Sequence, residues 1–217
     1  MSGRVRRVLL CSALVMLAMA VAHDAFAMRY QPYPNWMVAV AWGIGRGSFN
    51  AGSAGIGTAE YRNGAAPQIR FGRTFAKHWM VNAYYDAWLI EFDADDPDTD
   101  STELVKWRRS LQNLGVGFTV HPGNVNGASG GIYLRAGVGM GWAGTARVDV
   151  IEEEAQHHGE RIDEWGTGFS LGGGYDFWIS SNFQAGIGFT YNYFDIGEEI
   201  VDTAWFTAGT LNLNLFF

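Results

Sequence analysis

Two segments of this 217-residue chain carry side chains of the types that perform chemistry. Asp100 and Ser101 are neighbours in the first segment, and His157 and His158 are neighbours in the second. A serine nucleophile needs a histidine base within about 3 Å and an acid that orients that base. Nothing in the spacing brings the two segments together, and we therefore predict that the protein is not an enzyme.

Both segments are also rich in metal-ligand residue types. A calcium loop of EF-hand type that began at Asp96 would need glycine at the position of Ser101 and glutamate at the position of Trp107. The two adjacent histidines lie on a polar segment, where neighbouring imidazoles seldom share one ion. We therefore expect solvated acidic loops and assign no metal and no cofactor. The crowded aspartates of the first segment are Asp93, Asp95, Asp96, Asp98 and Asp100.

The acidic residues are concentrated in three short windows of a chain whose formal net charge is −7. Of the 21 acidic residues after position 27, 18 lie in residues 91–103, 149–164 and 195–202. The chain has no basic stripe that could neutralise phosphates, which excludes nucleic acid as a partner. This distribution indicates polar loops that join segments with few charges.

The first 27 residues have the layout of a signal peptide. Three arginines, at positions 4, 6 and 7, precede an apolar run over residues 8–22, and Ala25-Phe26-Ala27 is a typical cleavage site. The apolar run is shorter than the ~18–20 residues of an uncleaved anchor. We predict a signal peptide over 1–27 and a single domain over 28–217. The one cysteine, Cys11, lies in the leader, so the mature chain has no disulfide.

Eight segments between the polar windows alternate with a period of two, which is the period of a β-strand. In the last segment Leu211, Leu213 and Leu215 occupy one face, whereas Asn212 and Asn214 occupy the other. We predict an all-β fold, an eight-stranded antiparallel transmembrane β-barrel with up-and-down topology. The predicted strands are residues 36–45, 67–73, 79–91, 104–120, 132–142, 165–177, 183–193 and 205–217.

The fourth predicted strand is less regular than the others. Arg108, Arg109, Gln112 and Asn113 break the alternation upstream of Leu114. This break predicts either a bulge in the strand or a strand end that lies above the membrane.

The distribution of side-chain volume distinguishes a membrane barrel from a soluble one. A soluble eight-stranded barrel fills its interior with large apolar residues. In this chain one face of each strand is bulky and apolar, and the other is rich in glycine, alanine and asparagine. We take the glycine-rich face to be unable to form an apolar core, so the bulky face meets lipid. Long and short connections also alternate, as in outer-membrane barrels.

The closing strand ends on Phe217, the last residue of the chain. With the leader and the eight alternating strands, the mature chain resembles small outer-membrane β-barrel proteins of the OmpA-transmembrane-domain, OmpX and OmpW kind. The resemblance implies an integral bacterial outer-membrane protein, a monomer with both termini periplasmic. It also implies contact with outer-membrane lipid and lipopolysaccharide, and recognition of the strand ending at Phe217 by the barrel assembly machinery.

The polar face of the strands predicts a network inside the barrel. An eight-stranded barrel is only wide enough for side chains to fill it, and charges buried there must pair. We expect a plugged lumen and a structural or surface-interaction role. The alternatives are a narrow pore for ions or small solutes and, third, a lipid A-modifying acyltransferase or hydrolase that uses Ser101 with His157 or His158. The predicted inward residues are Arg70, Asn82, Asp86, Arg135, Asp176, Gln184, Asn192, Asn212 and Asn214.

Overall fold

The computed structural model describes residues 36–51, 62–76, 78–95, 104–122, 131–147, 161–197 and 201–217. The predicted signal peptide, the Asp100–Ser101 segment and the His157–His158 segment lie outside these residues. Within the described ranges, no helix is long and apolar enough to cross a membrane.

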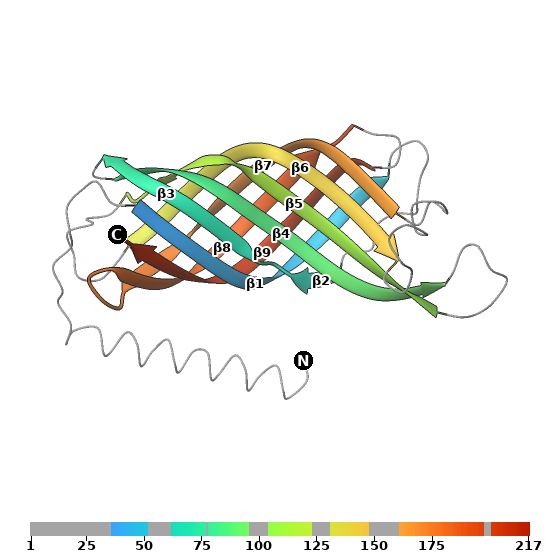
Figure 1. Cartoon of the computed structure of the whole chain (residues 1–217), viewed down its shortest axis with the longest axis horizontal. Coiled ribbons are helices and arrows are strands. Elements are labelled where there is room, and N and C mark those ends of the chain that lie inside the picture. The colour runs from blue at the N-terminus through green and yellow to red at the C-terminus, as the bar shows by residue number, and fades with distance from the viewer. Residues whose placement is uncertain are drawn as a thin grey trace, which may run out of the picture.

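The described residues form one antiparallel sheet that closes into a barrel (Figure 1). β1 pairs with both β2 and β3, each strand from β3 to β8 pairs with the next along the chain, and β9 pairs with β1. The strands are β1 (Trp36–Ala51), β2 (Arg62–Ala65), β3 (Gln68–Ala76), β4 (Trp79–Asp95), β5 (Leu104–Val120), β6 (Gly131–Arg147), β7 (Arg161–Trp178), β8 (Phe183–Asp195) and β9 (Val201–Phe216).

Strands β2 and β3 form one continuous wall that is interrupted at Pro67. Ala65 pairs with Ile44 and Gln68 pairs with Ala41, so the register along β1 is the same on both sides of the interruption. Proline has no backbone N–H, which removes one bond of the ladder. The Pro67 carbonyl still accepts a hydrogen bond from the Ala87 N–H at 3.0 Å. Counted with β2 and β3 as one strand, the barrel has eight strands, and the predicted eight-stranded antiparallel barrel is confirmed.

Strand β5 has no bulge, contrary to one of the two explanations offered for its irregular sequence. Its pairing with β4 and β6 runs to Val120 without a register shift. Gln112 lies on the outer face of the strand and bonds to two polar neighbours there. The Tyr85 hydroxyl donates to Gln112 Oε1 at 2.6 Å, and Gln112 Nε2 donates to Ser110 Oγ at 3.2 Å.

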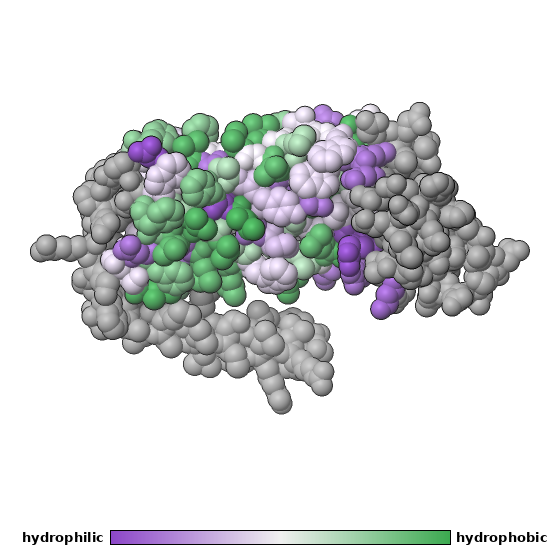
Figure 2. Space-filling view, in the orientation of Figure 1, coloured by the Kyte–Doolittle hydropathy of each residue, from purple (hydrophilic) through white to green (hydrophobic). Residues whose placement is uncertain are grey.

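The outer face of the barrel carries a belt of large apolar side chains (Figure 2). The exposed members range from 37% exposed for Val38 to 73% for Ile44. The closing strand shows the alternation clearly, since Leu211 is 65% exposed and Asn212 is 1% exposed. An apolar face of this extent is the surface that a lipid bilayer covers.

The two ends of the barrel differ. At the terminal end, on the left of Figure 1, Trp36 and Phe217 exchange backbone hydrogen bonds of 2.9 and 3.0 Å. The tight turn between β7 and β8 lies at the same end, where the Ile179 N–H bonds to the Phe183 carbonyl. At the loop end, on the right, lie the strand ends that flank residues 52–61, 96–103, 148–160 and 198–200.

Candidate functional site

The centre of the lumen is an ion pair between Asp86 on β4 and Arg135 on β6. Arg135 Nη2 lies 3.4 Å from Asp86 Oδ2, and the two residues are 8% and 0% exposed. The same carboxylate oxygen accepts a hydrogen bond from Ser170 Oγ on β7 at 2.9 Å. A charge pair buried this deeply persists only when hydrogen bonds satisfy its remaining atoms.

Arg135 also reaches the opposite wall of the barrel. Its Nη2 donates to Gln68 Oε1 at 3.0 Å and to Thr190 Oγ1, while Gln68 Nε2 donates to Thr190 Oγ1 at 3.1 Å. Three residues therefore connect β3, β6 and β8 across the lumen. Gln68 and Thr190 were not singled out from the sequence, although both lie on the inward face of predicted strands.

A chain of amides extends the ion pair toward the neighbouring walls. Asn192 Nδ2 donates to Asp86 Oδ2 at 3.4 Å, and Asn113 Nδ2 donates to Asn192 Oδ1 at 3.0 Å. The Tyr84 hydroxyl completes the chain with a bond of 3.4 Å to Asn113 Oδ1. Asn113 was taken as a break in the alternation of its strand, but it faces inward and is 0% exposed.

A second polar group surrounds Asp176 on β7. Asn214 Nδ2 donates to Asp176 Oδ2 at 2.9 Å and to Gln184 Oε1 at 3.4 Å. Arg70, which is 5% exposed, attracts the Asp176 carboxylate electrostatically. The four predicted lumenal charges therefore form two neighbouring groups, each with one arginine and one aspartate.

The remaining predicted residues bond to hydroxyl groups. Asn212 Nδ2 donates to the Tyr133 hydroxyl at 2.7 Å, and Thr210 Oγ1 donates to Asn212 Oδ1 at 3.0 Å. Asn82 Nδ2 donates to Thr119 Oγ1 at 3.0 Å, apart from the charged groups. Every predicted inward residue is at most 8% exposed.

Glycines on the inner wall make room for these side chains. A Cβ atom at Gly172 would lie 2.5 Å from Arg135 Nε, and one at Gly137 would overlap the Tyr84 ring, 3.0 Å from its Cζ. Neither overlap can be relieved by a small rotation, because both neighbours are buried. The large inward side chains therefore pack against rows of glycines on the inner wall, such as Gly137 and Gly172, which we call the glycine rows.

The lumen also holds an apolar cluster at its loop end, which we call the loop-end cluster. Its largest members are Trp88, Leu111, Phe194 and Phe206, all at most 2% exposed. The expectation that the glycine-rich face could hold no apolar core is wrong. The space left by glycine admits the rings: a Cβ at Gly47 would lie 2.9 Å from Trp88 Cδ2, and one at Gly141 would lie 2.5 Å from Phe194 Cδ1.

A smaller apolar cluster lies at the other end of the lumen, and we call it the terminal-end cluster. It consists of Met37, Ala39 and Met80, against which Phe216 packs. The centre of the Trp178 ring lies 5.2 Å from the centre of the Phe216 ring. The polar network therefore lies between two apolar layers.

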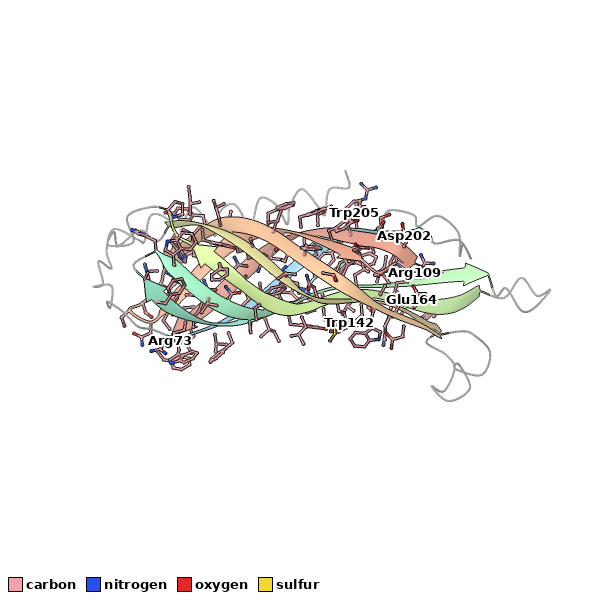
Figure 3. All side chains as sticks on the ribbon, turned by 90° about the horizontal axis from the view of Figure 1, so that it is seen from above. Arg73, Arg109, Trp142, Glu164, Asp202 and Trp205 are labelled. Carbon is pink, nitrogen blue, oxygen red and sulfur yellow. The ribbon has the colours of Figure 1, made fainter. Side chains whose placement is uncertain are left out.

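At the loop end of the barrel, two contacts join strands that are not neighbours in the sheet: β9 to β7, and β5 to β1. The backbone N–H of Val201, at the start of β9, donates to Glu164 Oε2 on β7 at 2.8 Å. The Arg109 guanidinium lies 5.6 Å from the centre of the Phe49 ring. In Figure 3, Arg109, Glu164 and Asp202 lie toward this end and Arg73 lies at the other.

Four buried atoms of the two charged groups have no hydrogen-bond partner among the described residues: Asp86 Oδ1, Arg135 Nε, Arg70 Nε and Asp176 Oδ1. Each is an atom that a water molecule could satisfy. The described part of the chain contains no group of three or more histidine, cysteine, aspartate or glutamate residues that could hold a metal ion. The candidate acyl-transfer residues Ser101, His157 and His158 lie outside the described residues.

No family model matches this sequence, and no curated protein is similar to it. Solved structures are similar in fold. The Neisserial surface protein A is 15% identical with a TM-score of 0.53, over 84% of this chain and 97% of that one. OprG, an outer-membrane protein of Pseudomonas aeruginosa, is 12% identical with a TM-score of 0.44, over 88% and 99%. The likeness to the Neisserial protein shows that the chain has the fold of the small bacterial outer-membrane β-barrels.

Proposed function

We propose that this protein is an integral outer-membrane barrel with a closed lumen and a structural or surface-interaction role, without chemical turnover. In this proposal both termini face the periplasm and the loop end faces the outside of the cell. The observation that carries it is the filling of the lumen. A hydrogen-bonded ion-pair network, whose predicted members are at most 8% exposed, lies between two apolar clusters.

Closure follows from the order of the layers along the barrel. An ion that entered from the loop end would first meet the rings of Trp88, Phe194 and Phe206, which offer almost no polar atoms to replace its hydration shell. Apolar constrictions of this kind exclude water and ions by dewetting. The ion would then have to displace a paired Arg135 and Asp86.

A surface role is supported by the way the strands continue past the apolar belt at the loop end. There, Arg108 on β5 and Glu91 on β4 form an exposed ion pair, with Arg108 Nη2 2.6 Å from Glu91 Oε1. Hydrophilic residues gather at this end in Figure 2. We infer that the charged rim contacts lipopolysaccharide or proteins outside the cell, while the belt contacts lipid. The barrel is a monomer in this proposal.

A narrow pore is the second candidate, and the unpartnered lumenal atoms favour it. Water molecules that satisfied Asp86 Oδ1, Arg135 Nε, Arg70 Nε and Asp176 Oδ1 would form a short polar file through the middle of the barrel. This row of water molecules would conduct ions only if the apolar clusters at both ends of the lumen opened.

Single-channel recording in planar bilayers separates the two candidates. We expect no conductance steps from the refolded wild type, or from Arg135→Ala, because the loop-end cluster is intact in both. Discrete openings of the wild type that grow in Arg135→Ala would contradict the closed lumen and favour the pore. A Trp88→Ala/Phe206→Ala variant shows which layer closes the lumen, since openings in that variant alone would identify the loop-end cluster.

The surface role has its own test. Residues 96–103 and 148–160 are replaced, one segment at a time, by glycine-serine linkers of equal length, and the amount of folded barrel in the outer membrane is checked. We expect reduced adhesion or altered outer-membrane permeability at unchanged barrel levels. If neither property changes in either variant, the surface role is excluded and a purely structural role is left.

A further inference from the structure

Two histidines face each other at the terminal end of the barrel. His78 immediately precedes β4, and His121 immediately follows β5. Trp79 and Val120 are paired in the ladder, so the two histidines occupy the next pair of positions. The His121 N–H donates to the His78 carbonyl at 2.9 Å, which continues the ladder through this pair.

Both imidazoles lie on the inner side of the wall. Residues directly opposite each other in an antiparallel pair project to the same face, with Cα atoms about 5.5 Å apart when the pair is hydrogen-bonded. Trp79 points outward and is 47% exposed, so the residue before it points inward. The centre of the His121 ring lies 6.3 Å from the centre of the Tyr133 ring, and Tyr133 is buried in the lumen.

One ring nitrogen of this pair has no hydrogen-bond partner among the described residues. This atom, His78 Nδ1, is buried. The neutral imidazole is the form of histidine that binds a metal ion.

We propose that His78 and His121 form a two-histidine site for a divalent transition metal at the terminal end of the lumen. Imidazole nitrogens suit zinc, copper and nickel, whereas calcium and magnesium require oxygen ligands. The described residues supply no third histidine, cysteine or carboxylate to this pair, so water completes the coordination. A bound ion joins the start of β4 to the end of β5.

Zinc titration of the full chain, refolded in detergent without an affinity tag, tests the site. The chain has five histidines, and the adjacent pair His157–His158 is the competing source of ligands. The variants are His78→Ala and His121→Ala, and the matched control is His157→Ala/His158→Ala. Binding is measured by calorimetry in the absence of other metals, and folding is measured by circular dichroism.

We expect the wild type and the control to bind one zinc ion per chain with the same affinity. Loss of either ligand should weaken binding at least about tenfold, because even loss of an outer-shell partner has an effect of that size. Wild-type affinity in either His78→Ala or His121→Ala, or loss of binding in the control, would overturn the proposal.

A second measurement keeps the test valid if either alanine variant fails to fold. Imidazole nitrogen resonances of the folded wild type are recorded by NMR before and after zinc is added. We expect two histidines that are also present in the control to shift together. Shifts confined to the resonances that the control lacks would contradict the site.

Discussion

The buried pair of Arg135 and Asp86, with its hydrogen-bond partners, connects β3, β4, β6, β7 and β8 across the lumen. Asp86 Oδ2 and Arg135 Nη2 bond to each other and to Gln68, Thr190, Ser170 and Asn192, which leaves Asp86 Oδ1 and Arg135 Nε without a partner among the described residues. Either side chain alone would leave an uncompensated charge in a space with little water. Truncation of one partner should therefore destabilise the barrel more than replacement of both partners by apolar residues.

Asp86→Ala should lower the free energy of unfolding by about 3–5 kcal/mol, since it leaves the Arg135 charge buried and unpaired. The double variant Asp86→Leu/Arg135→Met should lose less. The measurement is urea unfolding in lipid vesicles. Arg108→Ala is the control, because its pair with Glu91 is exposed and should contribute less than about 1 kcal/mol. A smaller loss in Asp86→Ala than in the control would contradict the prediction.

Gly137→Ala tests the packing of large inward side chains on the glycine rows. Its Cβ would overlap the Tyr84 ring, so we expect a loss of about 1–3 kcal/mol in the same assay. Adding Tyr84→Leu should recover part of the loss, because the two positions are in contact. Gly209→Ala is the matched control. Its Cβ meets no atom within 4 Å, and we expect little change.

His121 makes the stability of the barrel depend on pH. Burial, and then the nearby His78, lower its pKa from 6.5 to about 4 in the folded protein, so the unfolded chain binds more protons between these values. Stability should therefore fall as the pH is lowered from about 6.5 to about 4, by at most about 1.4 kcal/mol per pH unit from this group. His121→Gln should reduce this slope, measured in a chelator, and His157→Ala/His158→Ala should keep it.

At the scale of the strand, the alternation of large and small residues predicted which segments form the barrel but not how far they extend. β1, β6 and β7 all run past their predicted ends toward the loop end. There the outer face carries polar residues such as Arg46, so the contrast between the two faces, which is the predictive signal, disappears. β2 was missed for the same reason and because Pro67 separates it from β3.

The inward aromatic residues were missed for a related reason. Phe194 and Phe206 lie at or beyond the predicted ends of their strands, where the interior changes from polar to apolar. Contacts across the lumen could not be predicted at all. Arg135 and Gln68 are far apart in sequence, and the tilt and stagger of the strands bring them together.

At the scale of the whole molecule, the closing strand is the element on which we propose that membrane assembly depends. Phe217→Ala should reduce the amount of barrel in the outer membrane of cells, because we propose that the assembly machinery reads this strand. Refolding of the purified variant in detergent should change little, since Phe217 is 61% exposed. The control is Leu134→Ala, an outward apolar residue on β6. Equal loss in both variants would argue against specific recognition of Phe217.

The pairing of β1 with β9 makes closure of the barrel depend on both its first and its last strand. Its pairs join residues near the two ends of the described sequence, from Met37 with Phe216 to Ala51 with Val201. Closing a loop of that length carries an entropic penalty before any contact compensates for it, and such topologies fold slowly. A chain that stops before β9 leaves two strand edges open, which lipid does not tolerate. A chain shortened by interrupted translation or export therefore forms no smaller barrel. We expect that only chains that include β9 are stable in the membrane.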